Sequence, residues 1–81
     1  MKKKLYVVKI FREPLAFDEV CQLYCWGKNP VELENRVFEF LKANHDLKKL
    51  GFKEELISFQ TYPVEKKNVE VVRRFCSTFE I

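Results

Sequence analysis

The longest run of regularly spaced apolar residues lies within positions 29–51 and has the period of a helix. Its apolar positions recur at intervals of three and four, and they are Leu33, Val37, Phe40, Leu41 and Leu47. That spacing places the five side chains on one stripe of an α-helix. Burial of such a stripe contributes on the order of 10 kcal/mol, at about 1.5–3 kcal/mol for each side chain. The helix therefore requires a complementary apolar surface.

Both ends of this stretch carry residues that are common at helix boundaries. Asn29 suits the N-cap, Pro30 suits the first helical position, and the Glu32 carboxylate can reach back to the cap. Gly51 supplies a left-handed C-terminal cap, and Phe52 is expected to fold back as an apolar contact beyond it. The sequence thus predicts a helix over residues 29–51.

One segment interrupts the helical pattern. Asn44, His45 and Asp46 are three poor helix formers in succession. They predict a kink, or a break after which Asp46 caps a short second helix.

Three other stretches are rich in β-branched and aromatic side chains, which predicts β-strands, and the first two offer apolar or aromatic side chains to both faces. They cover residues 3–12, residues 18 or 19 to 28, and residues 55–64. The short loop between the first two most simply joins neighbouring antiparallel strands. Pro63 indicates that the third strand lies at a sheet edge or ends there, because proline cannot donate to a central ladder.

Residues 69–81 fit two patterns. As a strand, one face carries Val69, Val71, Phe75, Phe79 and Ile81. As a helix capped by Asn68, one stripe carries Val69, Val72, Cys76 and Phe79. The β-branched residues and the Thr-Phe-Glu-Ile ending favour the strand.

The expected fold is an α+β two-layer sandwich of one domain, residues 1–81. Its elements follow the order β-β-α-β-β, with two antiparallel hairpins that form a four-stranded antiparallel sheet and one long helix across one face. One helix covers only one face of such a sheet. The other face would then show Leu5, Val7 and Phe11, or alternatively Tyr24 and Trp26.

Monomeric proteins rarely leave an apolar patch of more than a few hundred Å² bare. A second copy, another protein, stacked bases, the alternative C-terminal helix or the loop at residues 15–17 is expected to cover this face. The net charge of +3 is compatible with nucleic acid but lower than in dedicated nucleic-acid binders.

The sequence gives no indication of a membrane span, a signal peptide, a disulfide framework or a zinc site. No apolar run approaches the roughly 18 residues of a membrane span. The apolar stretch after Lys4 is interrupted by Lys9 and has no cleavage site, which favours a basic-tipped strand over a signal peptide. Three cysteines, an odd number, indicate reduced thiols and a cytoplasmic location. Cys21 and Cys25 lie about 13 Å apart on a strand, too far for a disulfide or a shared zinc ion.

Catalytic motifs are absent from the sequence. His45, the single histidine, has Asp46 next to it in sequence, and adjacent helix residues do not face each other. With only two glycines, the chain has no Gly-rich phosphate loop. We therefore expect a non-enzymatic protein without cofactor, metal, small-molecule substrate or membrane association.

Two hypotheses of function remain. The first is association with a protein partner or as a homodimer, because aromatics and Arg are common interface anchors and an open sheet edge can pair with another strand. The alternative is binding of single-stranded nucleic acid, in which sheet aromatics stack on bases and Lys or Arg follow the phosphates. The candidate binding residues are Tyr24, Trp26, Lys28, Arg73, Arg74 and Phe75. The two arginines are expected to project to opposite sides of the last strand.

Overall fold

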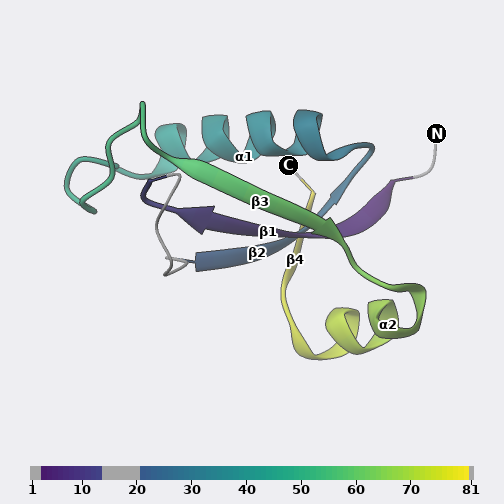
Figure 1. The fold of residues 1–81 in the computed structure, drawn as a ribbon. Helices are drawn as coiled ribbons and strands as arrows, with labels where there is room; N and C mark the ends of the chain where they lie inside the picture. Colours follow the sequence, from purple (N-terminus) through teal and green to yellow (C-terminus); the bar gives the residue numbers. More distant parts are fainter. Residues whose placement is uncertain (1–2, 14–20, 81) are drawn as a thin grey trace.

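The computed structural model describes residues 3–13 and 21–80 and shows an α+β fold with four strands and two helices (Figure 1). In chain order the elements are β1 (Lys4–Phe11), β2 (Cys21–Gly27), α1 (Pro30–Asn44), β3 (Ser58–Pro63), α2 (Lys66–Phe75) and β4 (Thr78–Glu80). The first three strands and the long helix lie within the predicted stretches, although α1 ends at Asn44 rather than near Gly51 and β3 begins at Ser58 rather than Glu55. Most of the predicted fourth strand is instead a helix, so the order is β-β-α-β-α-β.

The strands form a mixed sheet in the order β3-β1-β2-β4. β1 runs antiparallel to β2 and β3, whereas β4 runs parallel to β2. The antiparallel pairing of β1 with β2 and the edge position of β3 are confirmed. The predicted antiparallel sheet of two hairpins is wrong, because β3 and β4 lie at opposite edges and run in the same direction. Parallel strands need a crossover connection, usually a helix, and α2 makes that connection.

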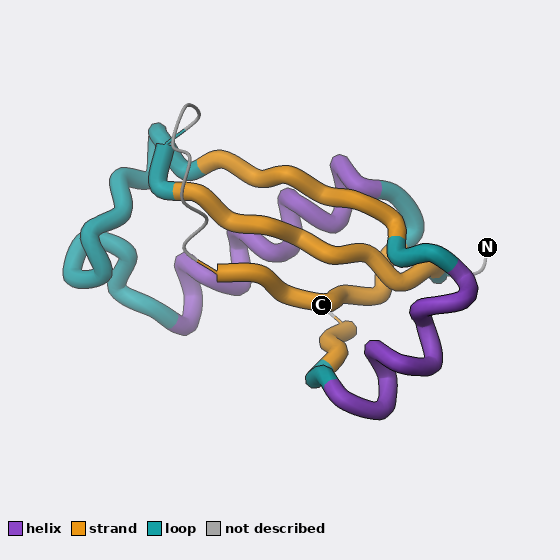
Figure 2. Tube along the Cα trace, turned by 60° about the horizontal axis from the view of Figure 1, so that its bottom comes forward, coloured by secondary structure: helices purple, strands orange, loops and turns teal. Residues whose placement is uncertain are grey.

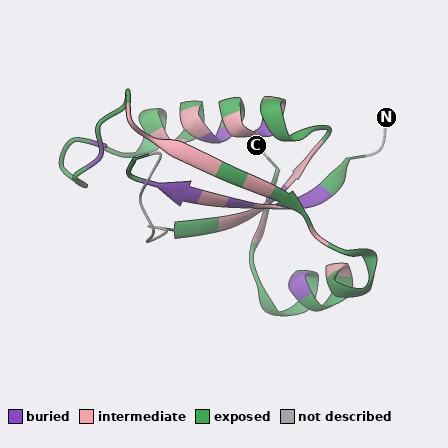
Figure 3. Cartoon of the chain, viewed as in Figure 1, coloured by how far each residue is buried: buried purple, intermediate pink, exposed green. Residues whose placement is uncertain are grey.

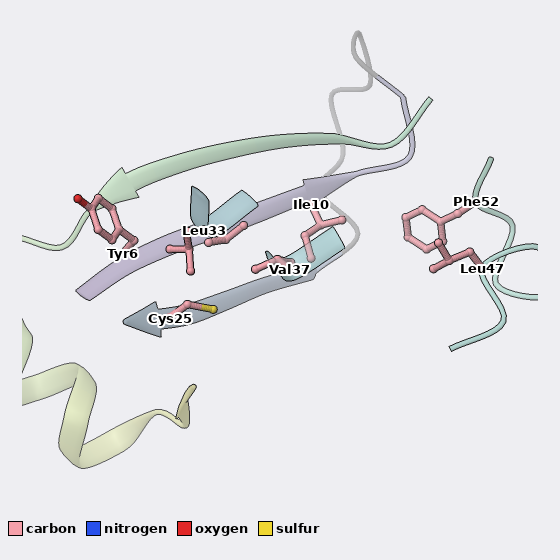
Figure 4. Packing of buried hydrophobic residues seen from close by; sticks show 8 residues of the cluster. Tyr6, Ile10, Cys25, Leu33, Val37, Leu47 and Phe52 are labelled. Carbon is pink, nitrogen blue, oxygen red and sulfur yellow. The ribbon is translucent and has the colours of Figure 1, made fainter. Parts of the chain in front are cut away.

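The core lies between α1 and the face of the sheet that α1 covers (Figure 3). Alternate residues of β1 point toward α1, and they are Tyr6, Val8 and Ile10. Leu33 and Val37 of α1 are buried against the sheet. The main core cluster consists of Tyr6, Val8, Ile10, Cys25, Leu33, Val37, Leu47 and Phe52 (Figure 4). The predicted helical stripe therefore supplies the core from the helical layer.

One member of the predicted stripe lies outside the core. Phe40 is 37% exposed. Phe38 packs against the core instead, with its ring 6.2 Å from that of Phe59 on β3 in an edge-to-face arrangement. The side of α1 that packs on the sheet therefore includes Phe38 in place of Phe40.

The start of α1 is the one that the sequence indicates. The Glu32 amide donates a hydrogen bond to Asn29 Oδ1 at 2.8 Å, and Pro30 occupies the first turn. The Glu32 carboxylate pairs with Arg36 at 2.9 Å rather than returning to the cap. The ion pair with Arg36, four residues further along the helix, uses the carboxylate that would otherwise reach the cap.

The end of α1 shows the predicted break. The helix stops at Asn44, and the chain continues in a hydrogen-bonded turn in which the Asp46 side chain accepts from the Lys49 amide at 3.3 Å. Gly51 has the left-handed φ of 86°. The Phe52 amide then donates to the Leu47 carbonyl at 2.8 Å, which brings both side chains back to the core.

The C-terminal part of the chain differs most from the prediction. α2 begins after Glu65 rather than Asn68, and only three residues form β4. The helical pattern that includes Val69 and Val72 was the correct alternative for residues 66–75. α2 lies on the side of the sheet away from α1, near one end of the strands, and leaves much of that face uncovered (Figure 2).

Candidate interaction surfaces

The sheet face that points away from α1, called the open face below, carries rows of side chains that cross the strands. One row consists of Gln60, Lys9 and Gln22. The next consists of Tyr62, Val7, Tyr24 and Thr78, and a third of Leu5, Trp26 and Glu80. Polar and aromatic side chains therefore predominate on the uncovered part of this face.

The two tyrosines of the open face are fixed by hydrogen bonds along their own strands. The Tyr62 hydroxyl donates to Gln60 Oε1 at 3.0 Å, and Gln22 Nε2 donates to the Tyr24 hydroxyl at 3.2 Å. Both hydroxyls thus reach toward the row that contains Lys9. The rings consequently lie along the sheet surface, one on each side of the central strand β1.

Leu5, Val7 and Phe11, which the sequence placed as one alternative on the face away from the helix, do lie on the open face and are mostly covered rather than bare. Leu5 is 2% exposed, Phe11 is buried and Val7 is half-buried. The Val64 amide, two residues before α2, donates to the Leu5 carbonyl at 2.9 Å. This bond continues the pairing of β1 with β3, and the chain then turns to α2, which lies on this side of the sheet (Figure 2). The predicted cover by residues 15–17 lies outside the described residues.

Of the three candidate residues in the predicted second strand, the structure keeps two on the open face. Tyr24 and Trp26 are half-buried neighbours on the open face, and Trp26 lies opposite Leu5. Lys28 follows the end of β2, so strand alternation no longer holds it on that face. It lines a hollow of about 170 Å³ at the start of α1, together with Trp26, Lys3 and Arg36.

α2 carries apolar side chains that are largely exposed to solvent. Phe75 is 80% exposed and Val71 is 55% exposed, one helical turn apart. Val72 is buried and Val69 is half-buried on the adjacent side of the same helix. The apolar arc of α2 is therefore wider than the part that packs on the protein. Val71 and Phe75 are called the α2 ridge below.

The charges around the α2 ridge are mainly positive. Lys67 precedes Val71 by one turn and Arg74 follows it by three residues, so both border the ridge. Arg74 forms no ion pair with any residue in the described ranges, whereas Arg73 pairs with Glu70 at 3.1 Å. The expectation that Arg73 and Arg74 lie on opposite sides of a strand is wrong, because both belong to a helix.

Titratable and nucleophilic side chains do not converge on these surfaces. Within residues 3–13 and 21–80, no group of three or more His, Cys, Asp or Glu residues could hold a metal ion. His45 is exposed, and its ring lies edge-to-face with that of Phe40, with 6.5 Å between the two ring centres. Burial raises the pKa of the Cys25 thiol to about 11, while Cys21 and Cys76 are exposed.

Neither helix in the described part of the chain has the length and apolar character that crossing a membrane demands.

Sequence reasoning missed several residues of both surfaces. Alternation placed Tyr62 and Gln60 on one face of their strand, but their approach to Lys9 depends on the strand order. Val71 belonged to the favoured strand pattern, and its exposure beside Phe75 follows only from the helical period. Comparison of the chain with protein-family models, curated proteins and solved structures gives no match. Function is therefore inferred from the geometry and charge of these surfaces.

Proposed function

We propose that the protein is a non-enzymatic interaction module that associates with another protein, or with a second copy, through the α2 ridge. The observation that carries this proposal is the exposure of Phe75, 80%, beside that of Val71, 55%. Leaving a Phe side chain in water forgoes about 1.5–3 kcal/mol relative to burying it. Large aromatic side chains with adjacent Arg are common anchors at protein interfaces.

The shape and charge of the ridge favour one kind of partner. Anchors at positions i and i+4 of a helix suit an apolar groove on another protein. Lys67 and Arg74 border these anchors, so acidic residues on the rim of the groove would complement them. A second copy that met the ridge with its own ridge would bring like charges together. A different protein with an acidic-rimmed groove is therefore the favoured partner.

The test compares a ridge variant, Val71→Ser with Phe75→Ser, with the control Val31→Ser. Val31 is 71% exposed near the start of α1, so the control removes a similar apolar surface elsewhere. Oligomeric state is measured by size exclusion with light scattering. Partners are captured, identified and titrated as purified proteins. We expect the ridge variant to lose about tenfold or more in affinity, as for interface hot spots, while the control binds like the wild type.

Thermal unfolding of the ridge variant is expected to match that of the wild type, because both replaced side chains are largely exposed. The proposal is overturned if the ridge variant keeps the oligomeric state of the wild type and binds the same purified partners with equal affinity. A dimer that the ridge variant dissociates would identify the second copy as the partner.

A second candidate function is binding of single-stranded nucleic acid on the open face. The observation that favours it is the arrangement of Tyr62 and Tyr24 on either side of β1, with Lys9 in the adjacent row. Aromatic rings that lie along a sheet can stack on bases, and a nearby lysine can bind the phosphate backbone. Gln22 and Gln60 add amide groups that can hydrogen-bond to base edges.

Fluorescence of Trp26, the single tryptophan, tests this second candidate. Titration with oligo(dT) and oligo(U) at low salt should quench it, with affinity falling as salt rises. Lys9→Gln should weaken binding and reduce the salt dependence, whereas Lys42→Gln on α1 should do neither. Absence of quenching at low ionic strength, or equal effects of the two substitutions, would remove this candidate.

A further inference from the structure

A hollow lies at the end of the molecule opposite α2, between the end of β1, the end of α1 and the turn at residues 47–52. Its volume is about 360 Å³. It is lined by Ile10, Arg12, Cys21, Leu41, His45, Leu47, Leu50 and Phe52. Pockets for small molecules typically have about 300–1,000 Å³, with mostly apolar walls and a few polar groups. This hollow has both properties.

Buried core residues form the floor of the hollow. Ile10, Leu47 and Phe52 all belong to the main core cluster. Leu47 and Phe52 extend from the turn back toward Ile10 (Figure 4). The hydrogen bond from the Phe52 amide to the Leu47 carbonyl, 2.8 Å, holds these two side chains together. The floor is therefore apolar and fixed by packing before any ligand arrives.

The rim of the hollow is positively charged. The Arg12 guanidinium lies 6.0 Å from the centre of the Phe52 ring, directly beside the apolar floor. Among the residues that the structure describes, none forms an ion pair with Arg12, and no Asp or Glu of these lines the hollow. A guanidinium offers two parallel N–H donors, an arrangement that matches the two oxygens of a carboxylate.

We propose that this hollow binds a small apolar molecule that carries one carboxylate. The hydrocarbon part lies on Ile10, Leu47 and Phe52, where it leaves water, and the carboxylate pairs with Arg12 at the rim. The residues come from β1, β2, α1 and a turn, so their spacing along the chain gives no sign of the site. The site is separate from the α2 ridge and does not depend on the proposed protein association.

The test uses the whole ¹⁵N-labelled chain and two probes of equal chain length, octanoate and 1-octanol. Amide shifts on titration should be saturable for octanoate and concentrated at the lining residues, such as Leu41, Leu50 and Phe52. Octanoate should bind about three- to tenfold more tightly than octanol, as expected for one charge-assisted contact at a partly exposed rim. Arg12→Gln should reduce octanoate binding to the level of octanol. Arg73→Gln on α2, a matched loss of charge, should leave it unchanged.

Arg12→Lys, which keeps the charge and loses the planar fork, should give an intermediate octanoate affinity. The amide spectrum of each variant away from the hollow shows whether it is folded as the wild type. Two results would overturn the proposal. One is the absence of saturable octanoate shifts at the lining residues. The other is equal binding of octanoate and octanol there with no effect of Arg12→Gln.

Discussion

At the scale of single residues, Gly27 determines how closely α1 approaches β2. A Cβ atom added to Gly27 would lie 3.1 Å from Leu33 Cδ1 and 3.3 Å from Leu33 Cβ. Leu33 is itself buried in the core, so it has little space into which to move. The missing side chain at the end of β2 therefore makes room for the first buried residue of the helix.

We expect Gly27→Ala to destabilise the protein by about 1 kcal/mol. Overpacking a filled core costs roughly 1–3 kcal/mol, and the lower entropy of the unfolded chain returns only about 0.4–1 kcal/mol. Urea denaturation measures the change. In a Leu33→Ala background both Cδ contacts are removed and only the 3.3 Å contact with the Cβ atom of residue 33 remains, so the same substitution should cost less there. A stabilising effect of Gly27→Ala in the wild-type background would contradict this packing.

Cys25 provides a second prediction for a single residue, because burial raises the pKa of its thiol to about 11. The folded protein holds this proton more tightly than the unfolded chain does. Stability is then complete below the ordinary thiol pKa of about 9 and falls as the pH rises toward 11. Urea unfolding at several pH values should show a steeper fall in this range for the wild type than for Cys25→Ala.

The same burial protects Cys25 from thiol reagents. At pH 8 the folded protein should be labelled at Cys21 and Cys76, which are exposed, and at Cys25 only after denaturation. Labelling of Cys25 at the rate of Cys21 in the folded protein would show that the site is more open than the structure indicates.

At the scale of elements, the cap of α1 can be tested directly. Asn29 Oδ1 accepts a hydrogen bond from the Glu32 amide, which is one of the unpaired donors of the first turn. Asn29→Ala should lower the free energy of unfolding by about 1 kcal/mol, whereas Asn29→Asp should retain it. Denaturant titration of the two variants gives the comparison. Equal losses in both would mean that the side-chain oxygen does not cap the helix.

α2 is the element for which local preference gave the wrong secondary structure. β-branched residues favour strands, but this preference spans only about 1 kcal/mol in a host protein and depends on context. Val69 and Val72, three residues apart, pack inward only in a helix, and the Arg73–Glu70 ion pair also has helical spacing. The connection between two parallel edge strands favours the same outcome.

At the scale of the whole molecule, stability should be unevenly distributed. β1 is paired on both sides and packed under α1, whereas α2 contributes Val72 as its one buried residue in the described structure. Local openings cost least where few apolar contacts are lost. Amides of α2 and β4 should therefore exchange with deuterium about tenfold or more faster than those of β1, a difference of about 1.4 kcal/mol. Equal protection of α2 and β1 would contradict this distribution.

The sequence by itself determined the parts whose signals are local. Asn29 and Pro30 marked the start of α1, Asn44 to Asp46 indicated a kink or break, and Gly51 indicated a position of left-handed φ. β-Branched and aromatic residues identified β1, β2 and β3, and Pro63 indicated that β3 lies at an edge or ends there. These features depend on backbone geometry and side-chain periodicity within a few residues, so they can be inferred without knowing what packs against them.

Only the tertiary structure decided the features that join distant segments. The position of β4 beside β2 made the sheet mixed and required α2 as a crossover. The strand order then brought Tyr62 and Tyr24 to either side of β1, and packing of Val72 left Phe75 in solvent. Pairing and burial at these sites depend on contacts between residues far apart in sequence, whose energies exceed the small local preferences that a single sequence displays.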